Sequence, residues 1–485
     1  MKTVTIIGGG FSGTMAAVNL ARLSDEALKI VLVNDRHPLG RGIAYSTTRS
    51  EHLLNVAARN MSAVPDHPGH FLDWLHTRSD FSDLPEPQLR EMYVPRRVYG
   101  DYLRSLLQNY LAPIDSHHPA EIEIVEAEAV DIVPSSKDGS ADVVLNNGDN
   151  IASDRILLAT GNQPPARLGR EETEEFKHPQ YCPDPWGNWR KRIPNSSENI
   201  VIVGTGLSMV DSFLTLEELG WRGQLIAISR NGMIPQSHFR GIDYPDFLPE
   251  NPESVGLAGM YALLKTHCEQ LTRLGENPGL VVDRLRPFTQ RIWQKFSLEE
   301  KQQFLKHYAA RWNVIRHRIA QPIHQRLTEA ITEGRVKVQR GSLEEIRANG
   351  GSLEVVTKTP DGDQQIIPGG LVINCTGPNA GFSHTKVKLF QNLLQRGLII
   401  PDELDMGIQV GPDFTVIDAN GVSSSKLYAM GALMKGTLWE TIAVPELRGQ
   451  AMRVAEMMIA TSTDHDQDRD YRLSVEEEHV IEYYI

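Results

Sequence analysis

Short apolar runs alternate with longer mixed stretches in the first part of the chain, and the same order returns near residue 200. The run Thr3-Val4-Thr5-Ile6-Ile7 predicts a buried strand, and the Ala- and Leu-rich residues up to about Leu23 predict a helix. An apolar strand is expected next, over Ile30–Val33. The second set of elements is expected at 200–203, 207–219 and 225–228. Two strand–helix–strand units predict an α/β fold with parallel sheets.

Glycines fill the turn after the first strand. Gly8, Gly10 and Gly13 have the spacing that gives a tight turn, close approach of a pyrophosphate and close helix packing, and Ser12 lies in the same turn. The helix N-terminus then offers N–H groups to phosphates. An acidic or amide residue at the end of the next strand, Asp35 or Asn34, is expected to hold a ribose hydroxyl.

The second unit carries Gly204, Gly206 and Ser208, but Met209 replaces the third glycine. Its second strand ends in Ser229-Arg230 instead of an acid. An arginine at this point suits a 2′-phosphate, because its planar donors bind phosphate in pairs. The sequence therefore predicts NADPH rather than NADH here. The alternative is that Arg230 is only a solvated charge at the strand end.

Each unit continues with alternating residues that predict a β-meander. In the first unit we expect it at 121–125 and 142–145, and in the second at 336–339 and 353–357. Each meander closes on a strand with small residues at its end, Ala159-Thr160-Gly161 and Cys375-Thr376-Gly377, where a cofactor can approach the backbone. The chain is therefore an internal repeat of two Rossmann-like dinucleotide-binding domains.

Residues 238–334 interrupt the second unit with a helical pattern. Ser297 and Glu300 form a capping box for a helix to Tyr308, and Pro322 should kink or divide the next helix, which Gly334 ends. Its apolar positions recur at three- and four-residue spacing: Trp312, Ile315, Ile319, Ile323, Leu327 and Ile331. Such an insertion is expected to cover a substrate cleft.

Composition narrows the class of protein. The chain has 49 Lys and Arg against 62 Asp and Glu, a net charge of −13, so nucleic-acid binding is not expected. No apolar run approaches a membrane span, and the first strand begins directly after Met1-Lys2, so neither a membrane anchor nor a signal peptide is expected. Three separate cysteines and no metal-ligand cluster favour a cytoplasmic protein without a metal site.

Longer motifs resemble the FAD-NAD(P)-binding family of bacterial proteins. The matching stretches lie between Ile6 and Arg448: 40–46, 52–56, 93–97, 204–211, 312–318 and 431–448. The resemblance implies FAD in the first unit and NADPH in the second. It also implies a similarity of some members to single-component N-hydroxylating flavin monooxygenases, including amino-acid N-monooxygenases.

The resemblance also implies a division of the chain into domains. The FAD-binding domain takes 1–162 and 381–460, and the NADPH-binding domain takes 163–237 and 336–380. A helical substrate or lid insertion takes 238–335, and a polar tail takes 461–485.

Several residues are implied to line the FAD site. Asn55 and Met61 are placed near the isoalloxazine ring, and Arg97 near the phosphate or ribitol, with a surface charge pair of Arg96 and Arg97 as the alternative. Arg41, between Gly40 and Gly42, is expected near the flavin phosphates, and Gly431 near the ribitol. A helix from Pro445 should stabilise negative charge on the ring. Trp439 either borders the flavin or simply packs in the core.

Three departures from neighbouring flavoprotein families narrow the expected chemistry. The absence of CxxC excludes a dithiol relay. Residues 176–186 occupy the place of the Baeyer–Villiger fingerprint but lack its spacing and its glycine, which makes ketone oxygenation less favoured. The presence of a nicotinamide domain argues against aromatic hydroxylases that have one dinucleotide domain.

The substrate side has four candidate residues, Arg316, His317, Arg318 and His238, besides Asn55. An arginine suits a substrate carboxylate, although a helix-surface or interdomain ion pair is the favoured reading of each arginine taken alone. His317 or His238 could serve as acid or base near neutral pH.

The expected function is an FAD-dependent, NADPH-consuming monooxygenase. It would act with O2 on a small polar substrate, with N-hydroxylation of an amine or amino acid through a flavin C4a-hydroperoxide. Two alternatives stay open, an NAD(P)H-dependent flavin oxidoreductase without oxygenation and a non-catalytic regulatory flavoprotein. Neither the substrate nor the oligomeric state is set by the sequence.

Overall fold

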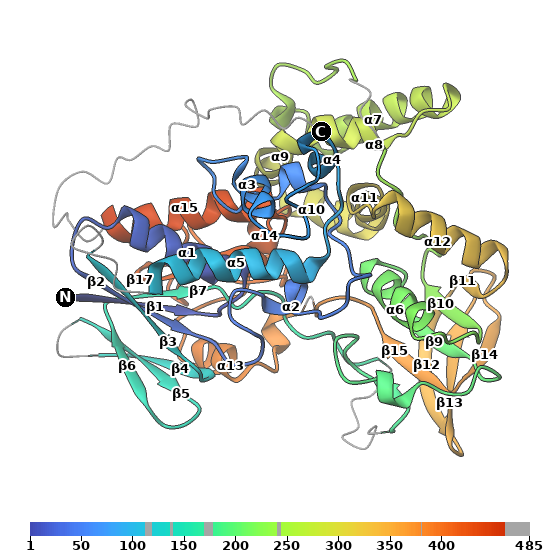
Figure 1. The fold of residues 1–485 in the computed structure, drawn as a ribbon, viewed down its shortest axis with the longest axis horizontal. Helices are drawn as coiled ribbons and strands as arrows, with labels where there is room; N and C mark the ends of the chain where they lie inside the picture. The colour runs from blue at the N-terminus through green and yellow to red at the C-terminus, as the bar shows by residue number, and fades with distance from the viewer. Residues whose placement is uncertain (112–118, 136–138, 169–177, 240–243, 380, 461–485) are drawn as a thin grey trace.

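The computed structural model describes residues 1–111, 119–135, 139–168, 178–239, 244–379 and 381–460. Two parallel sheets lie apart in the molecule, and helices 256–316 lie over the region between them (Figure 1). The predicted polar tail and the first two residues of the 176–186 segment lie outside the described residues. No helix of the described part is long and apolar enough to cross a membrane.

The first sheet has six strands in the order β16-β17-β7-β1-β2-β3. All neighbours are parallel except β16 and β17. The strands are β1 (Lys2–Ile7), β2 (Leu28–Val33), β3 (Ala120–Val125), β7 (Arg155–Leu158), β16 (Thr415–Ile417) and β17 (Ser423–Ala429). Helices α1 (Phe11–Leu23), α5 (Arg96–Leu111) and α15 (Val444–Ala460) pack together beside the sheet. The central strands are continuously apolar because both of their faces are covered.

The second sheet has five parallel strands in the order β11-β10-β9-β15-β8. They are β8 (Tyr181–Cys182), β9 (Ile200–Val203), β10 (Leu225–Ser229), β11 (Val336–Arg340) and β15 (Leu371–Asn374). Ile200 and Ile202 pack against α6 (Leu207–Glu218) and α12 (Gln321–Thr332), whereas Val201 and Val203 pack against a three-stranded meander. The repeated Rossmann-like architecture expected from the sequence is confirmed.

The predicted composition of the two meanders was wrong in one strand each. Strands 121–125 and 336–339 belong to β3 and β11, which are edge strands of the parallel sheets. An edge strand exposes alternate residues, so Glu121-Ile122-Glu123-Ile124 shows the alternation of a meander strand. The true meanders are β4 (Ala129–Pro134), β5 (Ala141–Leu145) and β6 (Asn150–Ser153), then β12 (Ser342–Asn349), β13 (Ser352–Lys358) and β14 (Gln364–Gly369).

The described part of the insertion contains six α-helices: α7 (Gly256–Arg273), α8 (Gly279–Leu285), α9 (Thr289–Lys295), α10 (Leu298–His307), α11 (Ala309–Arg316) and α12. The capping box of Ser297 and Glu300 starts α10 as predicted. Pro322 lies in the first turn of α12 and divides the periodic stretch, because the chain leaves α11 at Arg316. Helix α9 contacts the short helix α14 (Lys435–Leu438), so the insertion packs on the C-terminal return to the first sheet.

Candidate functional site

The first glycine loop is packed against the end of strand β7. Gly8 has φ of +111°, and a Cβ there would lie 2.5 Å from the carbonyl oxygen of Ala159. A Cβ on Gly13 would collide with the carbonyl oxygen of Gly8. Only glycine permits this backbone contact, which leaves the N-terminus of α1 open toward the strand ends.

Several of the other predicted FAD residues surround this loop. A Cβ on Gly10 would lie 3.5 Å from Cα of Gly42, and one on Gly431 would lie 3.2 Å from Oγ of Ser12. Thr160 has a buried hydroxyl without a hydrogen-bond partner among the described residues. A backbone cradle with a free buried hydroxyl fits the diphosphate and ribitol of a dinucleotide.

Asn34 and Asp35 have different environments at the end of β2. The side chain of Asn34 holds the loop, since it accepts from N of Gly9 at 3.2 Å and donates to the carbonyl of His37 at 2.8 Å. The side chain of Asp35 is exposed. The amide of Asn34 is therefore occupied within the loop, whereas the carboxylate of Asp35 faces solvent at the strand end.

The cationic residues predicted beside the flavin are mostly engaged. Arg41 pairs with Asp101, and Arg97 is half-buried in the first turn of α5. Met61 is buried. Arg96 is buried too and pairs with Asp211 of α6 at 2.6 Å, so it is not part of the surface charge pair that the sequence left as an alternative.

The second glycine loop repeats the geometry of the first. Gly204 has φ of +109°, and a Cβ there would collide with the carbonyl oxygen of Cys375, while a Cβ on Gly206 would meet nothing within 4 Å. Ser208 lies in the first turn of α6. The loop thus leaves space above the helix N-terminus, which fits a second pyrophosphate.

The small residues after β15 lie at the same edge of the second sheet. Thr376 is exposed and donates through Oγ1 to Asn374 at 2.7 Å, and Gly377 has φ of +86°. This turn is therefore stabilised within the chain, and its backbone stays accessible from the loop side.

Arg340 is a residue that the sequence reasoning missed. Strand β11 pairs in register with β10, so Arg340 lies opposite Ser229, and its Nε donates to the carbonyl of Arg230 at 3.3 Å. Ser229 itself binds Thr205 and N of Gly232. Two exposed arginines therefore lie together at this strand end. Arg340 could have been found by pairing 336–340 in parallel with 225–229. The prediction that 336–339 belongs to a meander concealed this pairing.

A buried polar cluster lies where α11, α14 and the start of α15 meet. Trp312 donates to Glu440 at 2.7 Å, and Arg286 binds both carboxylate oxygens of Glu446, at 2.9 and 3.2 Å. Arg316 is only 10% exposed and lies 3.6 Å from Glu440 and 3.7 Å from Glu446. These distances are too long for hydrogen bonds, so its Nε and Nη2 have no hydrogen-bond partner in the described part of the chain.

Burial acts on the charges of this cluster. It lowers the pKa of Arg316 below its usual range, and it lowers the pKa of Lys435 against the opposing effect of Glu440. Burial alone would raise the pKa of Glu446, but Arg286 and Arg316 hold it below its ordinary value. The cluster therefore keeps a charged carboxylate and a cation with free donors, which suits an anionic ligand group.

The two candidate histidines are neutral at pH 7. His238 donates through Nε2 to the carbonyl of Asn55, and burial followed by the charge of Arg318 lowers its pKa to about 4. Burial followed by the charge of Arg316 lowers the pKa of His317 to about 3. The expectation that either titrates near neutral pH is therefore wrong, because the site is desolvated and rich in arginine.

Arg318 does not reach the cluster. It is buried in a pair with Asp283 and its guanidinium lies 4.5 Å from the ring centre of Phe239. The structure thus joins His238 to Asn55, the charge of Arg316 acts on both His238 and His317, and Arg318 lies in an ion pair with Asp283.

Trp439 belongs to the core of the insertion. Its ring stacks on Trp293 with centroids 5.1 Å apart, and it is buried among the apolar residues of α9 and α10. Of the two predicted roles, bordering the flavin or packing in the core, the position of the ring agrees with packing in the core. Only its Nε1, which lacks a partner among the described residues, is left for a ligand.

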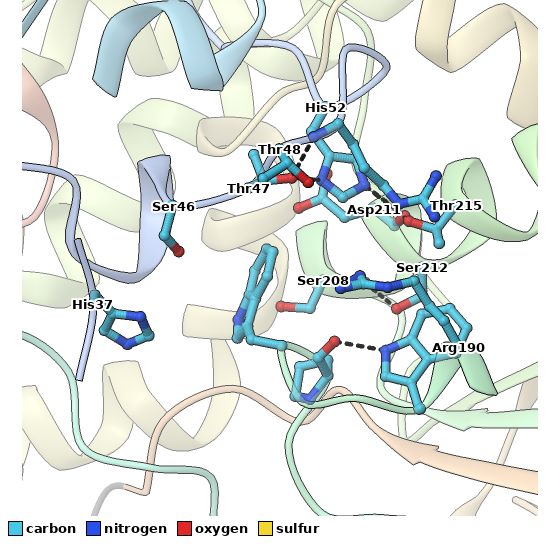
Figure 2. Close-up of a pocket in the computed structure, with 14 residues that line it drawn as sticks. His37, Ser46, Thr47, Thr48, His52, Arg190, Ser208, Asp211, Ser212 and Thr215 are labelled. Atoms are coloured by element: carbon cyan, nitrogen blue, oxygen red, sulfur yellow. Dashed lines mark hydrogen bonds between the residues drawn. The ribbon is translucent and has the colours of Figure 1, made fainter. Parts of the chain in front are cut away.

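A cavity of about 190 Å³ separates the first unit from α6 (Figure 2). Its walls carry hydroxyls from residues 46–48 on one side and from Ser208, Ser212 and Thr215 on the other. Beside the cavity the two units meet through polar contacts of Arg96 and His52 with α6 and through the apolar packing of Leu53 and Tyr93 on the core of the second unit. Within the described residues, no group of three or more His, Cys, Asp and Glu side chains could hold a metal ion.

Two parallel sheets, each with a glycine loop and a meander, give the chain the fold of two-domain Rossmann-type flavoproteins. Residues 5–163 match the model of the family described as FAD-NAD(P)-binding, which confirms the expected resemblance for the first unit. Among proteins of similar sequence, the uncharacterized protein Rv3403c of Mycobacterium tuberculosis is 20% identical over 412 residues, 77% of this chain and 74% of that protein.

Similar solved structures span both units. The ornithine hydroxylase PvdA from Pseudomonas aeruginosa has a TM-score of 0.65 at 15% identity and covers 95% of this chain and 99% of its own. The ornithine N-hydroxylase KtzI of Kutzneria sp. 744, described with reduced FAD, NADP+ and L-ornithine, has a TM-score of 0.62 at 15% identity, covering 95% and 98%. At this identity the likeness establishes the fold.

Proposed function

We propose that the protein is an FAD- and NADPH-dependent monooxygenase that hydroxylates a nitrogen of a small polar substrate. The observation that carries this proposal is the buried Arg316, whose free donors lie in a chain that also builds two dinucleotide cradles. The proposal is supported by the descriptions of PvdA and KtzI, which name ornithine hydroxylases of the same fold.

In the proposed FAD site, the loop 8–13 and Gly431 hold the diphosphate and ribitol, Asp35 binds the ribose, and Asn55 and Met61 border the ring. Bound FAD would supply hydride acceptance from NADPH and two-electron reduction of O2, with one oxygen atom going to the substrate nitrogen and the other to water. The chain contributes binding, orientation and exclusion of water by the insertion.

In the proposed NADPH site, Gly204, Gly206 and Ser208 hold the pyrophosphate, and Thr376 and Gly377 bound it from the next strand. Arg230 and Arg340 bind the 2′-phosphate, and Ser229 holds the turn between them. Because both arginines are exposed and adjacent, replacing both by Gln should weaken NADPH binding about 30-fold or more and leave NADH binding within about threefold. Titrations with both nucleotides measure this, and equal losses for NADH would contradict the assignment.

We further propose that Arg316 holds a carboxylate of the substrate. A carboxylate accepts two parallel N–H donors, and Nε and Nη2 of Arg316 make no hydrogen bond within the described part of the chain, although each lies at ion-pair distance from a glutamate. The neutral His317 and the backbone-bound His238 shape the region without adding charge. An amino acid therefore fits this site better than a diamine does.

Anaerobic mixing of the FAD-loaded protein with NADPH, followed by O2 and a panel of amino acids and diamines, tests the proposal. We expect flavin reduction by NADPH and a product heavier by one oxygen atom, detected by mass spectrometry, for at least one amino acid. Fast reduction with transfer to dyes but no oxygenated product would favour the oxidoreductase. No reduction by either nucleotide would favour a regulatory flavoprotein.

A further inference from the structure

The side chain of Arg96 bridges the two nucleotide-binding units. Its Nη1 donates to Asp211 of α6 at 2.6 Å, its Nη2 donates to Oδ1 of Asn55 at 3.3 Å, and its Nε donates to the carbonyl of Leu53 at 2.9 Å. The side chains of Arg96 and Asp211 are 11% and 8% exposed. One guanidinium therefore contacts the candidate flavin-side residue Asn55 and the helix of the NADPH loop together.

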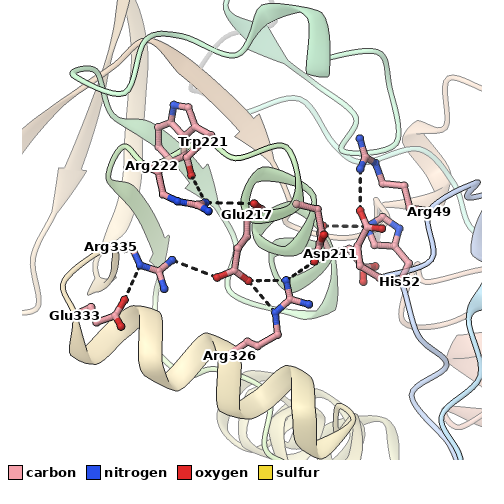
Figure 3. Close-up of polar contacts among 11 residues, drawn as sticks. Arg49, His52, Asp211, Glu217, Trp221, Arg222, Arg326, Glu333 and Arg335 are labelled. Carbon is pink, nitrogen blue, oxygen red and sulfur yellow. Dashed lines mark hydrogen bonds and ion pairs between the residues drawn. The ribbon is translucent and has the colours of Figure 1, made fainter.

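His52 adds a second contact between the units. Its Nε2 lies 3.1 Å from the carbonyl of Asp211 and 3.0 Å from Oγ1 of Thr215, and its Nδ1 lies 2.9 Å from Oγ1 of Thr47. Figure 3 shows His52 beside Asp211 of α6. The contact thus fixes the same turn of α6 that Arg96 reaches.

The contacts of Arg96 and His52 join parts of the two units that lie close to the two proposed nucleotide sites. Asp211 is one turn along α6 from Ser208. Contacts to Asp211 therefore fix the position of the helix whose N-terminus bounds the NADPH loop. Asn55 is tied to that unit at two points: its side chain accepts from Arg96, which also pairs with Asp211, and its carbonyl accepts from His238, which follows β10. Beside Asp211 a cavity of about 190 Å³ lies between the units, while Leu53 and Tyr93 of the first unit pack on the apolar core behind α6.

We infer that Arg96 is a positioning residue that fixes Asn55 relative to the NADPH unit and so sets the geometry of hydride transfer. A misplacement of about 1 Å in such a geometry costs about 100-fold in rate, whereas the affinity for each nucleotide depends on loops that Arg96 does not touch. The inference rests on the proposed function, because it concerns electron transfer from NADPH to FAD.

Stopped-flow reduction of the FAD-loaded protein by NADPH tests it with Arg96→Gln and Asp211→Asn. We expect the limiting rate of flavin reduction to fall about 10- to 100-fold in each variant, with FAD content and the Kd for NADPH changed less than about threefold. The double variant should be no slower than the slower single one, since both remove one interaction. Arg96→Lys should recover part of the rate through its remaining charge on Asp211.

Arg326→Gln is the matched control, because Arg326 of α12 pairs with Glu217 and Glu218 at the C-terminal end of the same helix, so its ion pairs lie within the second unit. Its rate should equal that of the wild type. Normal reduction rates in Arg96→Gln and Asp211→Asn, or losses that appear only in Kd or FAD content, would overturn the inference. If the wild type itself is not reduced by NADPH, the proposed function fails instead. Asp211→Asn keeps the size of the side chain and serves if Arg96→Gln does not fold.

Discussion

Three arginines show how one residue type takes different roles once it is buried. Arg96 bridges two units, Arg318 is neutralised by Asp283, and Arg316 keeps two donors without hydrogen-bond partners among the described residues. In the sequence, Arg316 and Arg318 are equivalent candidates two positions apart. They differ because α11 ends at Arg316: Arg316 is the last residue of the helix, whereas Arg318 belongs to the segment that follows it. No periodicity in the sequence fixes that end.

The free donors of Arg316 give the first prediction. Arg316→Gln should lower kcat/KM for a carboxylate substrate about 30- to 100-fold, because a charge-assisted pair of hydrogen bonds contributes about 2–3 kcal/mol. The rate of flavin reduction by NADPH in the absence of substrate should change little. Arg311→Gln, an exposed residue of the same helix, is the control. Equal losses for a diamine and an amino acid would contradict a carboxylate contact.

The second prediction concerns pH. The pKa of His238 is lowered to about 4 and that of His317 to about 3, from 6.5, so the unfolded chain takes up protons below pH 6.5 that the folded protein refuses. Stability from the two neutral histidines is complete above pH 6.5 and falls as the pH drops toward 4 and 3. Thermal melting between pH 7.5 and 4.5 should show a shallower loss in His238→Asn than in the wild type. The same substitution at the exposed His384 is the control. If melting temperature fell equally with pH in the wild type, in His238→Asn and in this control, the lowered pKa of His238 would be refuted.

At the scale of elements, the parts that could be predicted are those in which the local sequence and the final packing agree. The glycine loops, the capping box of Ser297 and the division at Pro322 depend on neighbours in the chain, and the structure confirms them. The assignment of 121–125 and 336–339 failed because an edge strand and a meander strand share one pattern. Arg340 was missed for the same reason, since its place beside Arg230 exists only through strand pairing.

The first glycine loop gives a prediction at this scale. A Cβ on Gly13 collides with the carbonyl oxygen of Gly8. Because this is a backbone atom and cannot rotate away as a side chain would, Gly13→Ala should displace α1 and prevent retention of FAD during purification. Absorbance of the bound flavin per protein measures this. Gly449→Ala in α15 is a fair comparison, because a Cβ there meets nothing within 4 Å. If Gly13→Ala retained full FAD occupancy, the loop would not be the diphosphate site.

At the scale of the whole molecule, the insertion is fixed to the first unit by polar contacts as well as by packing. Arg286, at the end of α8, binds Glu446 in the first turn of α15, Trp293 donates to the carbonyl of Gly436, and Trp312 binds Glu440. These contacts enclose the cluster around Arg316. The enclosure could not be predicted from the sequence, because it joins residues more than 120 positions apart.

Removal of Arg286 tests whether this attachment matters for the fold. Arg286→Gln leaves Glu446 buried with only the distant Arg316 as a counter-charge, so we expect a loss of about 3 kcal/mol in the free energy of unfolding, measured by denaturant titration. Protease cuts should appear first within 256–316, since the insertion loses its tie to α15. Arg396→Gln breaks a pair with Asp131 on the first unit in which the arginine is exposed, and it should change neither the stability nor the cutting pattern appreciably. An equally small effect of Arg286→Gln would mean that apolar packing of Trp293 against Trp439 holds the insertion without help from the ion pair.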